Sequence, residues 1–208
     1  MIRIAVVGKI GSGKSFVAKS FKLPLFNADK EVALIYKKNN FFFKKLNKKV
    51  PKFIKSFPIE KKEVLNCILA NNKNLKIITK IIHPIVRKKM SIFLKRNSKK
   101  KAIILDIPLY LENGINKKND VIIYVDANQK LINKRLKKRP YFNKKLLSKF
   151  KKIQLKSNLK KKKSSYIINN NFNSVIIKRK IKELKTKILK SNEWETNNSR
   201  YRDNRLGY

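Results

Sequence analysis

The chain has 208 residues, with 55 Lys and Arg against 12 Asp and Glu, which gives a formal net charge of +43. A hydrophobic content of 42% is enough to build a core, so the composition excludes a wholly disordered chain. One cysteine and one histidine exclude a disulfide framework and argue against a zinc site. Every apolar run is far shorter than the roughly 20 residues that span a bilayer. The N-terminus lacks the features of a signal peptide. We expect a cytoplasmic monomer without membrane association.

The positive charge allows two interpretations. Lysine and arginine neutralise phosphates, so a charge of +43 favours a nucleic-acid partner. However, lysine outnumbers arginine by 46 to 9 and is spread along the whole chain, together with 27 Ile and 24 Asn. Because these residues share A/T-rich codons, compositional drift of the genome explains the same bias. Either way, we expect the surface to bind polyanions non-specifically at low salt.

The first predicted strand, residues 2–7, leads into a glycine-rich loop. Residues 8–15 read GKIGSGKS and fit the pattern G-x-x-x-x-G-K-[ST] at every defined position. A helix is predicted directly afterwards, over residues 14–22. Between a strand and a helix, this pattern predicts a phosphate-binding loop, in which Lys14 reaches the terminal phosphates of a nucleotide and Ser15 ligates Mg²⁺. The alternative is a glycine-rich turn without a ligand.

A short second strand over residues 23–27 is followed by Asp29. A carboxylate at this position could accept a proton from an attacking hydroxyl, or it could cap the helix that starts near Lys30. From 30 to 100 the pattern is helical and is interrupted by three prolines. At the third, Pro84, we expect one helix to end after His83 and another to begin. The lone His83 is either a packing residue or part of a site.

Two apolar runs, residues 102–107 and 121–125, have the composition of parallel strands that are covered on both faces. Asp106 ends the first run as either a Walker-B-like metal ligand or a strand cap. Further along, a helix is predicted over 128–139, a very basic segment over 140–164, a last strand over 166–168 and a closing helix over 174–190. The absence of a late Asn-Lys-x-Asp motif argues against a GTPase, and the short chain favours a small-molecule kinase with a lid.

Several of these segments together resemble one family. They are GKIGSGKS at 8–15, NAD at 27–29, IIHPIVR at 81–87, LDIPLYLEN at 105–113, RLKKR at 135–139, Gln154 and IINN at 167–170. Over about residues 2–190 the chain resembles the dephospho-CoA kinase family. The resemblance implies an α/β P-loop NTPase fold, with a parallel five-stranded sheet flanked by helices. It also implies ATP-dependent phosphorylation of the ribose 3′-hydroxyl of dephospho-CoA with Mg²⁺, the last step of coenzyme A synthesis.

The same resemblance implies a division of the chain and a set of site residues. The expected core comprises 1–29, 102–134 and 165–190; a helical acceptor-binding insertion covers 30–101, a lid 135–164 and a poorly ordered tail 191–208. Asp29 and Lys14 are the expected catalytic residues. The expected ATP-binding residues are Gly11, Ser12, Gly13, Lys14, Ser15, Phe16, Arg139 and Asn170. The expected acceptor-binding residues are His83, Arg87, Pro108, Leu109 and Glu112, the lid residues are Arg135 and Lys160, and the metal ligands are Ser15 and Asp106.

Some residues depart from the family pattern, and two other functions stay open. Asn27 stands where the family has aspartate, and Ser165 stands where it usually has aspartate as well. One alternative is another P-loop kinase acting on a nucleoside monophosphate or a small alcohol. The other, from a different class, is a basic nucleic-acid-associated protein. Arg135 could equally be a solvated helix residue.

Overall fold

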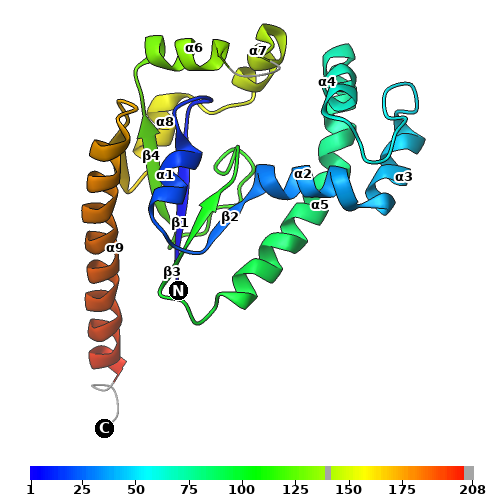
Figure 1. Ribbon diagram of the computed structural model, residues 1–208. Coiled ribbons are helices and arrows are strands. Elements are labelled where there is room, and N and C mark those ends of the chain that lie inside the picture. Colours follow the sequence, from blue (N-terminus) through cyan, green and yellow to red (C-terminus); the bar gives the residue numbers. More distant parts are fainter. Residues whose placement is uncertain (139–141, 204–208) are drawn as a thin grey trace. The chain divides into compact units, whose positions relative to one another are not determined.

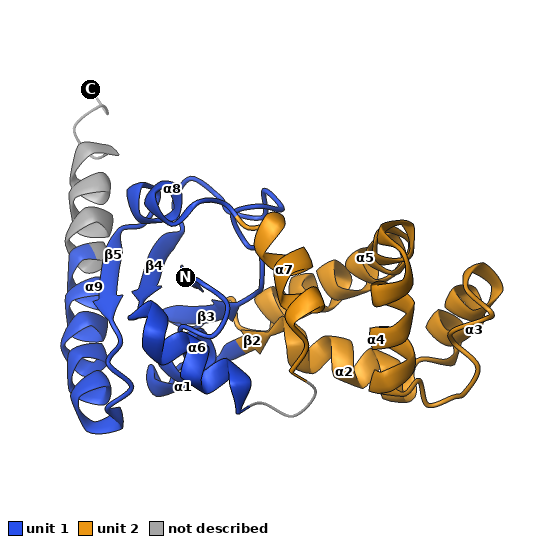
Figure 2. Ribbon diagram, turned by 90° about the horizontal axis from the view of Figure 1, so that it is seen from above, with its two compact units in different colours: residues 1–25, 99–138, 155–208 blue, residues 26–98, 139–154 orange. Residues whose placement is uncertain are grey.

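The computed structural model describes the backbone of residues 1–138 and 142–203, and side chains as far as Ser191. Two compact units divide the chain (Figure 2). Unit 1 comprises residues 1–25, 99–138 and the chain from Leu155 onward. Unit 2 comprises residues 26–98 and the described part of 139–154.

The chain forms a parallel five-stranded sheet, and all five predicted strands are confirmed (Figure 1). Four of the strands lie in unit 1, and β2 begins at the last residue of the first segment of unit 1. The strand order is β2-β3-β1-β4-β5. The strands are β1 (Ile2–Gly8), β2 (Leu25–Asn27), β3 (Ala102–Asp106), β4 (Val121–Asp126) and β5 (Tyr166–Asn169). In the middle of the sheet Ile4 lies opposite Ile104 on β3 and Val121 on β4. β3 is buried along its whole length, as expected of a parallel strand covered on both faces.

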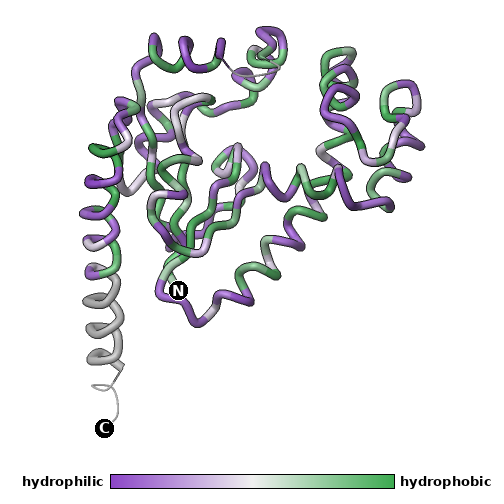
Figure 3. Tube along the Cα trace, in the orientation of Figure 1, coloured by the Kyte–Doolittle hydropathy of each residue, from purple (hydrophilic) through white to green (hydrophobic). Residues whose placement is uncertain are grey.

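Four helices of the described chain belong to unit 1: α1 (Lys14–Ser20), α6 (Gln129–Lys137), α8 (Ser157–Lys162) and α9 (Ser174–Asp203). Val17 and Phe21 from the α1 region pack with Ile177 and Ile181 of α9 against strand residues such as Ile123. Along these helices hydrophilic and hydrophobic residues alternate (Figure 3), because one side of each faces solvent. The predicted closing helix therefore exists and its backbone continues to Asp203, into the segment where we expected a poorly ordered tail.

Unit 2 is helical, as expected for the insertion, and has a core of its own. Its helices are α2 (Ala28–Lys38), α3 (Asn40–Lys49), α4 (Lys61–Ala70), α5 (Asn72–Arg96) and α7 (Lys144–Lys152). Ile35, Phe42, Leu46 and Ile54 are fully or almost fully buried at its centre. Asparagine side chains begin four of these five helices by accepting a backbone N–H bond in the first turn, which explains part of the abundance of this residue.

The prediction of a helix boundary at His83 and Pro84 is wrong. α5 runs without interruption from Asn72 to Arg96, with Pro84 inside it. An internal proline removes one backbone hydrogen bond and costs about 3 kcal/mol. Buried Ile78 and Ile82 precede the proline, and Ile85 and Val86 pack against the same core after it. Packing on both sides of Pro84 thus outweighs the local cost.

Candidate active site

The glycine-rich loop connects β1 to α1, as its sequence predicts. Gly13 is the residue before α1 and has φ of 93°, a conformation that side chains disfavour. At Gly8 a Cβ atom would lie 2.6 Å from the carbonyl oxygen of Val125, so only glycine fits beside β4. Both glycines are therefore needed for the loop to follow this path at the end of the sheet.

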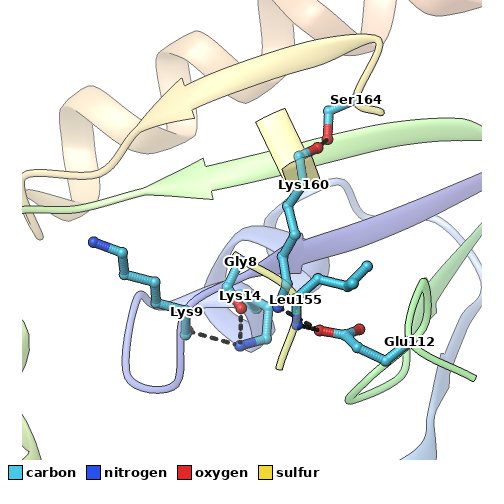
Figure 4. A network of polar contacts seen from close by, with 7 residues as sticks. All are labelled: Gly8, Lys9, Lys14, Glu112, Leu155, Lys160 and Ser164. Atoms are coloured by element: carbon cyan, nitrogen blue, oxygen red, sulfur yellow. Dashed lines mark hydrogen bonds and ion pairs between the residues drawn. The ribbon is translucent and has the colours of Figure 1, made fainter. Parts of the chain in front are cut away.

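Lys14 is the first residue of α1, and its side chain contacts the glycine-rich loop that precedes it. Its Nζ donates to the carbonyl oxygens of Lys9 at 2.9 Å and Gly8 at 3.2 Å (Figure 4). The hydroxyl of Ser12 is fully buried and has no hydrogen-bond partner among the described residues. Because a buried polar group without a partner is costly, this hydroxyl fits a loop whose ligand supplies an acceptor. An ammonium and an unpaired hydroxyl in one glycine-rich loop are suited to phosphate oxygens.

Asn170 directly follows β5 and binds this loop through its side chain. Its Nδ2 donates to the carbonyl oxygen of Ser12 at 2.8 Å, and its Oδ1 accepts from Phe172 N–H at 2.9 Å. The backbone N–H of Asn170 donates to Asp126 O at 2.7 Å. Only 3% of Asn170 is exposed. Asn170, which we expected to bind ATP, therefore helps to fix the shape of the phosphate loop.

We predict that Asn170→Ala weakens both the fold and ATP binding. The variant leaves the buried Ser12 carbonyl and the partly buried Phe172 N–H without these partners, which costs about 1–3 kcal/mol. Urea unfolding should show this loss, and the KM for ATP should rise by about tenfold as the loop relaxes. Asn133→Ala is the matched control, because Asn133 is exposed on α6, does not line the neighbouring cavity and accepts one bond from Gln129 Nε2. Equal effects of the two variants would contradict this role of Asn170.

A cavity of about 400 Å³ lies beside Asn170 in unit 1. Its lining residues are Asp126, Ala127, Asn128, Leu131, Asn169, Asn170, Asn171 and Lys180. Close by in sequence, the guanidinium of Arg135 stacks over the ring of Phe172, with its Cζ 4.4 Å from the ring centre. Arg135 itself is exposed in the last turn of α6. Arg139, the arginine expected to bind ATP, lies outside the described residues.

Glu112 and Lys160 meet in unit 1, although the resemblance assigned them to different parts of the site. The Nζ of Lys160 lies 2.7 Å from Glu112 Oε1, and both side chains are more than nine-tenths buried. The backbone N–H of Leu155 donates to the same oxygen at 3.0 Å. Pro108 and Leu109 precede Glu112 in the loop after β3, where Leu109 has φ of 58°.

A second buried network fixes the other end of this loop, and sequence reasoning missed it. Asp120 Oδ1 pairs with Arg3 Nε at 3.0 Å, while Asp120 Oδ2 accepts from the Tyr110 hydroxyl at 2.5 Å. Arg3 Nη2 also donates to that hydroxyl, at 2.9 Å. Burial and the neighbouring Asp120 carboxylate raise the pKa of Tyr110 well above its ordinary value, so its hydroxyl stays a donor. The only sequence signal was an acid, Asp120, at the start of an apolar strand.

We expect Asp120→Asn to lower the free energy of unfolding by about 3 kcal/mol, because it leaves the buried guanidinium of Arg3 without its counter-charge. The side chains of Arg3 and Asp120 are only 11% and 2% exposed. Chemical denaturation would measure the loss, with the exposed Glu183→Gln as a control for removing one carboxylate. A stability equal to that of the control would contradict the importance of this network.

Three of the predicted site residues, Asp29, His83 and Arg87, belong to unit 2. Asp29 lies in the first turn of α2, where the cap is Asn27, whose Oδ1 accepts from Lys30 N–H at 2.7 Å. Asp29 is therefore not the cap of α2, and its side chain is exposed. His83 lies half-buried on α5, one turn before the exposed Arg87. Burial and the charge of Arg87 lower the pKa of His83, which favours a neutral imidazole.

The oxygen donors expected for Mg²⁺ lie in unit 1. Ser15 is exposed at the start of α1, and Asp106 is buried at the end of β3. Among the described residues no group of three or more His, Cys, Asp and Glu is placed to hold a metal. A hydroxyl and a carboxylate suit Mg²⁺, which commonly binds through one or two protein oxygens together with nucleotide phosphates. The residues therefore fit an ion that arrives with ATP.

A P-loop between the first strand and first helix of a parallel sheet, with a helical insertion, defines a kinase of the P-loop class. The family model for dephospho-CoA kinase matches residues 2–175. The chain belongs to the dephospho-CoA kinase family. No helix in the described part of the chain has the length and apolarity needed to cross a membrane.

Individual relatives agree with this family. The dephospho-CoA kinase of Wolbachia pipientis is 28% identical over 186 residues, covering 87% of this chain and 95% of the relative. That of Fusobacterium nucleatum is 32% identical over 178 residues, covering 82% and 90%. Among solved structures, TT1252 from Thermus thermophilus matches with a TM-score of 0.72 at 22% identity, over 89% of this chain and 97% of that one. The dephospho-CoA kinase from Campylobacter jejuni matches with a TM-score of 0.61 at 21% identity, over 89% and 96%. At these identities the two structures support the fold.

Proposed function

We propose that this protein transfers the γ-phosphoryl group of ATP to the ribose 3′-hydroxyl of dephospho-CoA, giving coenzyme A and ADP. The observation that carries the proposal is a complete P-loop, with Lys14 held inside it, in a chain that matches the dephospho-CoA kinase family over residues 2–175. We assign the reaction to the cytoplasm and to a monomer. Binding of other polyanions to the charge of +43 should be weak and disappear with salt.

The phosphates of ATP would bind at the loop. The unpaired hydroxyl of Ser12 is an available donor, and the backbone from Gly11 to Phe16 leads into the N-terminus of α1. The N–H groups of Ser12 and Phe16 donate within the loop, to the carbonyl oxygens of Lys9 and Gly13. Lys14 now donates to two loop carbonyls and would turn to the β- and γ-phosphate oxygens. Mg²⁺, held by Ser15 and Asp106, would neutralise phosphate charge.

The transfer itself needs one proton acceptor. The 3′-hydroxyl oxygen forms a bond to the γ-phosphorus, the bond from that phosphorus to the β,γ-bridging oxygen breaks, and ADP leaves. Asp29 is our candidate to accept the hydroxyl proton, because it is an exposed carboxylate in the first turn of α2, directly after β2. Lys14 would stabilise the charge that develops on the transferring oxygens.

The two substrates would use different parts of the chain. The cavity beside Asn170 is a candidate for the nucleoside of ATP, with Arg135 and Phe172 as the adjacent stacked pair. His83, Arg87, Pro108 and Leu109 are candidates for the acceptor. A neutral His83 could accept a hydrogen bond from a ribose hydroxyl, or donate one to it, without adding charge.

A panel of acceptors tests this function. The protein would be mixed with Mg-ATP and, in separate reactions, dephospho-CoA, AMP, CMP, adenosine and shikimate, and the products would be identified by mass. We expect one added phosphoryl group on dephospho-CoA alone. Turnover of another acceptor in preference would leave a P-loop kinase with a different substrate, and no transfer to any acceptor would contradict the proposal.

A further inference from the structure

The side chain of Glu112 is bound by two other groups of the protein. Its Oε1 accepts from two donors, the ammonium of Lys160 at 2.7 Å and the backbone N–H of Leu155 at 3.0 Å. The side chain of Glu112 is 9% exposed and that of Lys160 is 4% exposed. A carboxylate that is buried in this way is stable only when it is paired and hydrogen-bonded, and Glu112 meets both conditions.

The two donors lie where the chain re-enters unit 1. Gln154 is the last residue of the second segment of unit 2, and Leu155 is the first residue of the final segment of unit 1. Glu112 therefore holds the chain directly after the segment that includes α7. Lys160 lies five residues further on, in α8, and its own carbonyl oxygen accepts from the Ser164 hydroxyl at 2.7 Å. Figure 4 shows the Glu112–Lys160 pair beside Lys14 and the end of β1.

α8 has little apolar surface with which to hold itself in place. It has six residues, and Lys160 is the one that is buried. Its leucine, Leu159, is 46% exposed. A second ion pair, between Lys161 and Asp126 at 2.6 Å, is much more exposed and contributes less to stability. The buried Glu112–Lys160 pair is thus the main attachment of α8 beside the P-loop.

We propose that Glu112 and Lys160 are positioning residues. Their contacts hold the part of the expected lid segment that returns to unit 1, from Leu155 to Lys160, next to the P-loop. Glu112 then contributes to phosphoryl transfer through Lys160 and Leu155, and its carboxylate does not bind the acceptor. The kinetic part of this proposal rests on the proposed function. Its structural part, the attachment of Leu155, does not.

Four variants test the proposal in the full chain: Lys160→Met, Glu112→Gln, the double variant Glu112→Gln/Lys160→Met, and Lys160→Arg. Hydrogen exchange of the Leu155 amide would report the attachment directly, and steady-state kinetics would be measured for each substrate. Lys161→Met is the matched control, since it removes a neighbouring lysine and an exposed ion pair. The double variant leaves no unpaired buried charge and is expected to fold even if a single variant does not.

We expect the amide hydrogen of Leu155 to exchange about tenfold faster than in the wild type in Lys160→Met, in Glu112→Gln and in the double variant. All three should lower kcat/KM for ATP by about 100-fold, because a displacement near 1 Å is enough for such a loss. The KM for dephospho-CoA should change by less than about twofold, and the double variant should be no worse than the single ones. Lys160→Arg keeps the charge and should retain more activity than Lys160→Met, and Lys161→Met should resemble the wild type.

Three results would overturn the proposal. A higher KM for dephospho-CoA alone in Glu112→Gln would make this carboxylate an acceptor ligand. A slow Lys160→Met variant beside a normal Glu112→Gln variant would place Lys160 directly on the phosphates. Unchanged exchange at Leu155 in every variant would remove the attachment itself. If the wild type phosphorylates no acceptor, the proposed function fails, while the exchange measurement still decides whether the pair holds Leu155.

Discussion

Lys14→Ala should lower kcat by about 1,000-fold, the effect of removing one well-placed donor from the transferring phosphoryl group. The ammonium of Lys14 lies at the loop carbonyls of Gly8 and Lys9, within the structure that would surround the phosphates. Its removal deletes a charge that no other side chain of the loop can supply from the same position. Single-turnover measurements with saturating Mg-ATP would separate this loss from weaker binding.

The control for this variant is Lys9→Ala. Lys9 belongs to the same loop and has the same charge, but its Nζ contacts the exposed Gln129 at 3.4 Å, and its carbonyl oxygen stays in place in alanine. We expect its turnover to stay within about threefold of the wild type, since exposed lysines contribute little beyond a screened charge. Equal losses in both variants would mean that the loop responds to overall charge, and would contradict a specific role of Lys14.

Asp29→Asn should lower kcat by about 100- to 10,000-fold, the range for a general base in position. The amide has the same shape but cannot take the proton of the attacking hydroxyl. Stability should change by less than about 1 kcal/mol, because Asn27 provides the cap of α2 and Asp29 is exposed. The pH profile of kcat should also lose its acidic limb.

Glu31→Gln is the matched variant for Asp29. Glu31 lies in the same first turn of α2, and its carboxylate pairs with Lys89 of α5 at 3.0 Å. Removing this exposed pair should leave turnover within about twofold of the wild type. Near-normal turnover of Asp29→Asn, or a similar loss in both variants, would remove Asp29 from the catalytic role.

Local sequence patterns were sufficient for the strands and for the phosphate loop. Strands in a covered parallel sheet are continuous apolar runs, and the runs at 102–107 and 121–125 need no distant information to be recognised. The loop is specified in the same way, because its glycines and Lys14 are neighbours along the chain. The helical insertion followed from its composition and from the spacing of its apolar residues.

Tertiary packing decided what the local patterns could not. Pro84 has the local properties of a helix breaker, but the core contacts of α5 on both of its sides keep the helix continuous. The partners of Asn170 and Glu112 lie 158 and 43 residues away along the chain. A resemblance could assign these residues to a site, but their bonds to Ser12 and Leu155 required the topology. The Arg3–Asp120 ion pair likewise joins residues that are distant along the chain, so it also required the topology.

The position of the added phosphate on the product tests the central claim most directly. Wild-type protein and Lys14→Ala would be incubated with Mg-ATP and dephospho-CoA, and the purified product would be examined by phosphorus NMR. We predict one new phosphomonoester on the ribose 3′-oxygen in the wild-type reaction and a trace of it in the variant reaction. A phosphate on another oxygen, or equal amounts of product from both proteins, would contradict transfer to the 3′-hydroxyl at this P-loop.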